Sequence, residues 1–113
     1  MHELSLAQEI IKILEEQIGL HRVTKVHMVK VKVGKLMSVV PSSLLFCFEI
    51  ASKGTKLEGA KLEIEEIPVK CFCRRCREEF IVESFVFSCP KCQGTDLKQI
   101  SGNEFYIHSM EVD

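Results

Sequence analysis

Two closely spaced pairs of cysteines are the residues of this chain best placed to do chemistry. The first pair is Cys73 and Cys76, the second is Cys89 and Cys92, and twelve residues lie between the pairs. Two intervening residues let both sulfurs of a turn reach one ion, so two such turns supply the four ligands of a tetrahedral zinc site, as in a zinc ribbon. Because protein sulfur would fill all four positions, the predicted zinc is structural and not catalytic.

The residues around these cysteines also predict a dependence on metal. The stretch from Cys71 to Thr95 holds few apolar residues, too few for an independent core. Structural zinc contributes roughly 10–16 kcal/mol to the folding of small zinc-binding peptides near neutral pH. We therefore expect this segment to be unfolded without its ion.

The same cysteines leave other interpretations open. Iron in a rubredoxin-like centre uses similar pairs, and the colour of the purified protein would separate it from zinc. Disulfides are disfavoured, because nothing at the start of the sequence resembles an export signal and the thiols are expected to meet a reducing compartment. Cys71 could replace Cys73 as a ligand, although the two-residue spacing favours Cys73. Cys47, on an apolar helix, is expected to be a buried core thiol.

The amino-terminal residues offer a second and different set of donors. His2 can bind one ion through its imidazole Nδ1 and its own deprotonated backbone amide, together with the amine of Met1, and the backbone nitrogen of Glu3 can supply a fourth donor. Four nitrogens in a plane suit Ni(II) or Cu(II), with copper bound more tightly, and do not suit tetrahedral zinc. From chemistry alone, a histidine near a terminus is more often simply solvated, so both interpretations stay open at this point.

The spacing of apolar residues predicts the helices and strands that position the cysteines and the amino-terminal donors. Apolar residues at helical spacing predict a helix from Leu4 to Gly19, with Ser5 and Gln8 as its capping box and residues 1–4 as a short free arm. An apolar face and a first-turn proline predict a second helix. Alternation of apolar and polar residues predicts strands. The second helix is expected over 41–53 and the strands over 29–33, 61–69 and 105–112.

This order of elements predicts an α+β fold class. Two helices are expected to cover one face of a small antiparallel sheet, with a zinc-ribbon-like Cys₄ domain inserted between two of its strands. We expect an α/β domain of residues 1–69 plus 96–113 and a zinc-binding domain of residues 70–95.

Composition and charge narrow the function classes. The chain has 113 residues, 46% of them hydrophobic and 27% charged, which is typical of a folded, water-soluble protein. Its net charge of −1 gives no field that attracts nucleic acid or an anionic membrane, and no apolar run is long enough to cross a bilayer. Without a paired nucleophile, a phosphate-binding loop or convergent carboxylates, we do not expect an enzyme. We expect a cytoplasmic monomer or weak homodimer with no nucleic-acid or membrane partner.

Three segments together resemble the HypA/HybF family of hydrogenase maturation proteins, and the likeness covers the whole chain. They are Met-His-Glu-Leu-Ser at residues 1–5, Pro-Ser-Ser-Leu-Leu-Phe-Cys-Phe at residues 41–48, and the four cysteines. The resemblance implies a nickel metallochaperone whose amino terminus binds Ni(II), while an inserted zinc domain holds a structural ion. It makes His2 the essential nickel ligand, supported by the backbone nitrogens of His2 and Glu3 and the amine of Met1.

The resemblance also implies partners. They are the HypB GTPase and the large-subunit precursor of a [NiFe] hydrogenase, to which nickel would be delivered. Relatives that also serve urease place histidines beside their cysteine pairs, and neither pair has one here. This difference disfavours a role with urease.

The main alternative is a zinc-ribbon module that binds nucleic acid or protein. Its motivation is a group of basic residues around the cysteines, which could contact phosphates. No aromatic residues alternate with these charges, so a solvated face that offsets the negative zinc–thiolate unit is the competing explanation. Salt-dependent binding to nucleic acid would favour the module. The basic residues are Lys70, Arg74, Arg75, Arg77, Lys91 and Lys98.

Overall fold

The computed structural model describes residues 2–113, and Met1 lies outside the described residues. The chain divides into two compact units. The first contains the chain up to Lys32 with residues 39–65 and 106–113, and the second contains residues 33–38 and 66–105. The elements are α1 (Glu3–His21), β1 (Val26–Gly34), the 3₁₀ turn η1 (Lys35–Met37), α2 (Pro41–Ser52), β2 (Lys61–Ile67), β3 (Lys70–Cys73), β4 (Glu78–Ile81), β5 (Leu97–Ser101) and β6 (Phe105–Val112).

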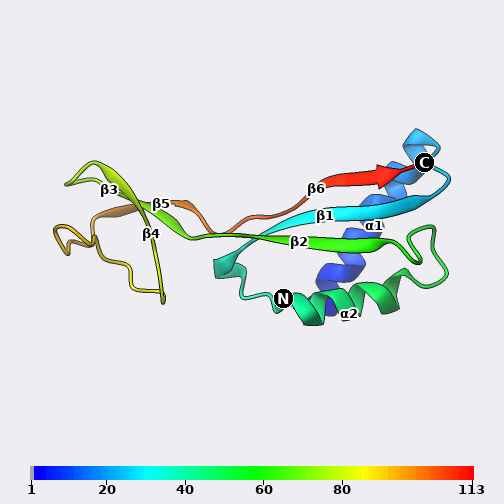
Figure 1. The fold of residues 1–113 in the computed structure, drawn as a ribbon, viewed down its shortest axis with the longest axis horizontal. Coiled ribbons are helices and arrows are strands. Elements are labelled where there is room, and N and C mark those ends of the chain that lie inside the picture. The colour runs from blue at the N-terminus through cyan, green and yellow to red at the C-terminus, as the bar shows by residue number, and fades with distance from the viewer. Residues whose placement is uncertain (1) are drawn as a thin grey trace. The chain divides into compact units, whose positions relative to one another are not determined.

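Two helices and one three-stranded sheet make up the larger part of the fold. The strand order is β2-β1-β6, and α1 and α2 pack against each other beside this sheet (Figure 1). β1 and β2 are neighbours in the sheet although α2 lies between them in the chain, so a helical crossover joins this pair. The arrangement confirms the predicted α+β class, in which two helices accompany a small sheet and the cysteine-rich segment is inserted before the last strand. Within residues 2–113, neither helix is both long and apolar enough to span a membrane.

The core of the first unit follows the periodicities seen in the sequence. On β1, the fully buried Val29 and Val31 alternate with Lys30 and Lys32. The two lysines lie on the other face, where both form ion pairs with Glu65 of β2, at N–O distances of 3.6 and 3.2 Å. A hydrogen bond from Lys32 is the main reason that the pKa of the Glu65 carboxyl is lowered. The apolar stripe of α1 faces the core through Leu6, Ala7, Ile10, Ile11, Leu14 and Ile18, and that of α2 through Leu44 and Phe48.

The boundaries of α1 differ from the prediction at both ends. The helix begins at Glu3 with His2 as its N-cap, so the predicted capping box of Ser5 and Gln8 is wrong, and residues 2–4 are not a free arm. The N-terminal acidic side chain of Glu3 suits the positive end of the helix dipole and favours this earlier start. At the other end Arg22, not Gly19, adopts the left-handed conformation that terminates the helix.

The second unit is built on a smaller antiparallel sheet of order β4-β3-β5. β3 pairs with β4 from Lys70 opposite Ile81 to Cys73 opposite Glu78, and with β5 on its other side. Three buried residues, Val69, Cys71 and Val82, form its apolar core, against which Leu36, Phe80 and Leu97 pack. The predicted zinc domain, residues 70–95, lies inside this unit, and the division into domains itself stays a prediction.

Two glycine backbones approach each other closely in the second unit. A Cβ built on Gly34 would lie 2.0 Å from the carbonyl oxygen of Gly102, and Gly102 itself has a φ of +123° and packs against Val69. Hydrogen bonds on either side fix this approach. The N–H of Gly34 donates to the carbonyl of Glu104 at 2.7 Å, and the N–H of Leu36 donates to the carbonyl of Gly102 at 2.8 Å. No side chain fits between these backbones.

Substitution of Gly34 by alanine should therefore destabilise the protein. The added methyl group must displace backbone atoms, and we expect a loss of about 1–3 kcal/mol in the free energy of unfolding. Urea unfolding of the zinc-loaded chain measures this change. Gly19→Ala is the matched control, because a Cβ there meets nothing within 4 Å and alanine favours a helix by about 0.5–1 kcal/mol. Equal unfolding midpoints for Gly34→Ala and wild type would contradict the steric argument.

Candidate metal centres

The structure brings together the four cysteines of the two predicted pairs. Their sulfur atoms all lie within 4.8 Å of one another. The Sγ atoms of Cys73 and Cys92 are 3.7 Å apart, and those of Cys76 and Cys89 are 3.8 Å apart. Four sulfurs bound tetrahedrally at about 2.3 Å from zinc would be separated by about 3.8 Å. The donor set and its spacing thus fit one tetrahedral ion.

Both cysteine pairs adopt the same local backbone. In each, the N–H four residues after the first cysteine donates to that cysteine's carbonyl at 2.7 Å, from Arg77 to Cys73 and from Gln93 to Cys89. Arg77 and Gln93 both have positive φ, 58° and 61°. The repeated conformation shows that the two turns are equivalent structural units.

Backbone N–H groups point at the sulfurs of these turns. Donors of this kind stabilise thiolate charge and orient the sulfur toward a metal. Gly94 is confined as well, since a Cβ there would lie 3.2 Å from the Sγ of Cys92. The donor–acceptor pairs are Cys76 N–H to Cys73, Lys91 N–H to Cys89 and Gly94 N–H to Cys92, each at 3.4 Å.

The thiols of the cluster differ strongly in acidity. Backbone hydrogen bonds, that from Cys92 first and then that from Lys91, lower the pKa of Cys89 to about 6. The hydrogen bond with Cys92 and burial raise the pKa of Cys76 to about 12. Sulfurs this close cannot all carry negative charge unless a cation compensates them. Four thiolates at these distances would therefore need a bound cation between them.

The other cysteine interpretations can be compared with this geometry. All six cysteines are free, and the 3.7 Å between the nearest cluster sulfurs far exceeds the roughly 2.05 Å of a disulfide. Cys71 lies outside the cluster in the apolar core of the second unit, where burial raises the pKa of its thiol. Cys47 is only half-buried, so its predicted place in the core is wrong, because α2 turns Leu44 and Phe48 inward instead. Iron and zinc share this ligand geometry.

The predicted nickel ligands lie at the start of α1. Met1 lies outside the described residues, while His2 is the exposed N-cap with φ −76° and ψ 146°, and Glu3 is the first helical residue. The Oε1 of Glu3 accepts a hydrogen bond of 3.3 Å from the N–H of Val40, which is the N-cap of α2. Sequence reasoning missed this contact, because no periodic pattern links residues so far apart in the chain.

The backbone nitrogens at this position are unusual in being available to a metal. The first N–H groups of a helix have no intrahelical acceptor. A metal that displaces the amide protons of His2 and Glu3 therefore breaks no helical hydrogen bond. The resulting negative nitrogens lie at the positive end of the helix dipole, which stabilises them.

The remaining histidines and basic residues have ordinary surroundings. His27 Nε2 lies 2.7 Å from a carboxylate oxygen of Asp113, and His108 lies 3.1 Å from the hydroxyl of Ser109. Three of the six basic residues near the cysteines form ion pairs on the surface, and paired cations are less available to phosphates. These pairs are Arg74 with Asp96, Lys91 with Glu78, and Lys70 with Glu79.

Comparison with known protein families gives a match over nearly the whole chain. Residues 1–112 match the family model described as "Hydrogenase/urease nickel incorporation, metallochaperone, hypA". The chain is 41% identical over 113 residues to the hydrogenase maturation factor HypA of Desulfitobacterium hafniense, covering 100% of this chain and 99% of that protein. It is 40% identical to the protein of the same name from Acidithiobacillus ferrooxidans, with 100% of both chains covered.

Solved structures show the same fold. The solution structure of the Ni metallochaperone HypA from Helicobacter pylori superimposes with a TM-score of 0.68 at 24% identity, covering 99% of this chain and 97% of that one. A second solution structure of a HypA protein gives 0.73 at 25% identity, covering 99% and 96%. The architecture of two helices, small sheets and an inserted cysteine-rich segment is therefore shared with these proteins.

The sulfur geometry predicts one tightly bound zinc ion per chain. Cys92→Ser removes one of four sulfurs and leaves a weaker hydroxyl donor, so we expect the variant to lose zinc on dialysis. Elemental analysis of the dialysed protein measures the zinc content. Cys47→Ser is the matched control, a second half-buried cysteine outside the cluster, and should retain one zinc. Full zinc retention by Cys92→Ser, or a coloured iron centre in the wild type, would contradict the assignment.

Proposed function

Because this chain belongs to the HypA family of nickel-incorporation metallochaperones, as its sequence resemblance indicated, we propose that it binds Ni(II) through its amino terminus and delivers it during [NiFe] hydrogenase maturation. The family takes part in hydrogenase maturation and is a family of metallochaperones, not of enzymes. We further propose that nickel is held by a domain of residues 1–69 plus 96–113, and a structural Zn(II) ion by a domain of residues 70–95.

The observation that carries the nickel proposal is the position of His2 and Glu3 at the start of α1. The proposed ligands are the Met1 amine, the backbone nitrogens of His2 and Glu3, and the imidazole of His2. Four nitrogens in one plane favour Ni(II) over tetrahedral ions. Two deprotonated amides neutralise the charge of the ion, and the helix dipole stabilises them.

The exposure of His2 supports delivery as well as binding. A carrier must release its ion to another protein, and an incoming donor atom can reach a square-planar centre from either open side. The carboxylate of Glu3 meanwhile accepts a hydrogen bond from Val40, which ties the start of α1 to the start of α2. We propose that this bond keeps the nickel-binding end in one place while ligands exchange.

The zinc proposal rests on the cluster of Cys73, Cys76, Cys89 and Cys92. Two of these sulfurs belong to buried residues, and three of the four each accept a hydrogen bond from a backbone N–H. An ion bound among them would hold the fold of the second unit together. Four protein sulfurs leave no open position for a substrate. Zinc and nickel would thus have separate roles in one chain.

The proposed partners follow from the family's role in hydrogenase maturation. They are the HypB GTPase and the large-subunit precursor of a [NiFe] hydrogenase. We propose that this chain meets them in the cytoplasm, as a monomer or weak homodimer. The alternative of a nucleic-acid-binding zinc ribbon is weaker, since half of the basic residues on which it rests are already paired with acidic residues. No membrane partner is proposed.

His2→Ala should abolish stoichiometric nickel binding and leave one zinc ion in place, because it removes the imidazole and leaves the cysteine cluster untouched. Isothermal titration with NiCl₂, beside elemental zinc analysis, measures both. Glu3→Ala is the matched control. It loses the hydrogen bond with Val40 but keeps the backbone nitrogen, which is the only nickel ligand proposed for Glu3, so it should still bind one nickel. Wild-type nickel affinity in His2→Ala would refute the ligand assignment.

Extension of the chain by one residue ahead of Met1 tests the role of the terminal amine. The extra residue converts the amine to an amide, so we expect nickel affinity to fall sharply while the zinc content stays the same. Nickel titration of the extended and native-start proteins measures the difference. Equal affinities would show that the amine is not a ligand.

A further inference from the structure

The small sheet of the second unit has one covered face and one open face. Cys71 of β3 belongs to the apolar core of the unit, against which Phe80 of β4 and Leu97 of β5 pack. Successive side chains of a strand point to opposite faces, so Lys70 and Phe72 lie on the other side of β3. This other side is the open face. The residues of β3 on it and their cross-strand partners are Lys70, Phe72, Glu79, Ile81, Lys98 and Ser101.

One row of the open face runs from a negative charge to a positive charge. Glu79 of β4 and Lys98 of β5 lie on either side of Phe72, because each is its partner in one of the two ladders. Glu79 and Lys98 are exposed, and Phe72 is half-buried. In the neighbouring row Lys70 is paired with Ile81, which is 46% exposed. An aromatic ring thus lies between opposite charges on a surface that the described chain leaves open.

This order of charges is complementary to itself. A second copy can pack its open face on the first about a two-fold axis that runs parallel to β3 and passes through Phe72. Each Glu79 then lies opposite Lys98 of the other copy, and the two Phe72 rings meet on the axis. Stacked sheets lie about 10 Å apart with nearly aligned strands, a separation that a Glu and a Lys side chain can span together. One symmetric contact therefore forms two ion pairs around an aromatic pair.

The other charges on the open face do not oppose this contact. Lys70 would lie opposite Lys70 of the other copy, but its ammonium group is 3.7 Å from the carboxylate of Glu79. Since Glu79 lies on the edge strand β4, the two-fold axis directs the two ammonium groups toward opposite edges of the interface. Beyond the end of β3, Arg74 and Asp96 already pair with each other at 3.0 Å.

The cysteine turns of the two copies would lie at the same end of the axis, so their charges must also balance. Lys91 pairs with Glu78. Arg75 and Arg77 add two positive charges, and a zinc ion held by four thiolates leaves that centre with two negative charges. With the proposed ion in place, the turns therefore add no net charge that would separate the copies.

We propose that two copies of this chain associate through the open face, with their small sheets packed face to face. The contact is small. Six side chains on each copy are far fewer than the roughly 20–30 residues that a stable interface uses on each side, so we expect a dissociation constant on the order of 0.1 mM. This inference goes beyond the proposed carrier function, because it names the surface of a weak homodimer and does not depend on nickel.

Charge reversal at the two ends of the row tests the symmetry. Glu79→Lys places two ammonium groups opposite each other at both ends, and Lys98→Glu does the same with carboxylates, so each variant alone should dimerise about tenfold more weakly. An equimolar mixture of the two variants restores both opposite-charge pairs and should form a heterodimer about as stable as the wild-type dimer. Sedimentation equilibrium of the zinc-loaded proteins, at concentrations from about 10 μM to about 1 mM, measures the dissociation constants.

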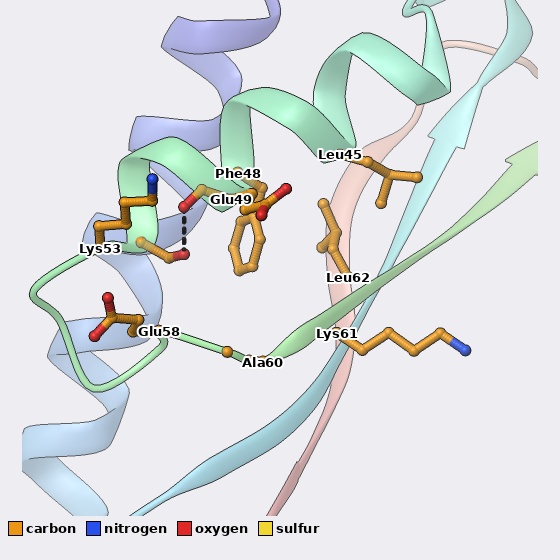
Figure 2. A pocket seen from close by; sticks show the side chains of 10 residues that line it. Leu45, Phe48, Glu49, Lys53, Glu58, Ala60, Lys61 and Leu62 are labelled. Carbon is orange, nitrogen blue, oxygen red and sulfur yellow. Dashed lines mark hydrogen bonds between the residues drawn. The ribbon is translucent and has the colours of Figure 1, made fainter.

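Lys53→Glu is the matched control, because it makes the same change of charge on an exposed lysine outside the second unit. Lys53 lies beside α2 and, with Leu45, Phe48 and Leu62, lines a hollow of about 580 Å³ (Figure 2). This variant should dimerise as the wild type does. Elemental zinc analysis of every variant shows whether the second unit has kept its fold.

Three outcomes would overturn the proposal. They are a wild type that stays monomeric at the highest concentration, a dimer that neither charge reversal weakens, and a mixture that associates no better than the single variants. If the wild type is monomeric and binds single-stranded DNA in a salt-dependent way that Phe72→Ala abolishes, the open face belongs to nucleic acid instead. Nickel affinity of the same samples should not change, so this proposal and the carrier function can fail separately.

Discussion

Four sulfur atoms held within 4.8 Å of one another are the constraint on which the second unit depends. Their negative charges repel each other unless a cation lies among them, and only three buried side chains form the apolar core beside them. The backbone donors to Cys73, Cys89 and Cys92 orient the sulfurs but do not supply a full positive charge. With the proposed zinc ion bound, the free energy of folding of this unit would largely be that of metal binding.

The nickel site proposed for the first unit depends on a different physical principle. Its helices and sheet have a conventional core, with Val29 and Val31 of β1 fully buried, and need no ion to pack. The proposed nickel donors are instead backbone groups that the end of a helix leaves unpaired. An ion bound there can leave without loss of core packing, which suits cargo. In the proposed function, one unit would retain zinc and the other would carry nickel.

The sequence was informative where spacing alone determines structure. The two-residue spacing within each cysteine pair predicted which four sulfurs lie close together. The alternation of apolar and polar residues predicted β1, β2 and β6. It was less informative where a tertiary contact decides. Ser5 looked like a helix cap, but the helix starts at Glu3, whose carboxylate bonds the distant Val40. Cys47 on the apolar α2 was predicted to be buried, but it is only half-buried. The composition of a helix does not show which of its apolar side chains the rest of the chain covers.

The equal conformations of Arg77 and Gln93 have a consequence for how the second unit comes apart. Each is a non-glycine residue held at positive φ by a 2.7 Å hydrogen bond to the first cysteine of its pair. Such backbone geometry stores of order 1 kcal/mol or more per residue. Loss of the proposed zinc ion would release both turns from this conformation together. We therefore expect metal loss and unfolding of the two turns to occur in one cooperative step, and not ligand by ligand.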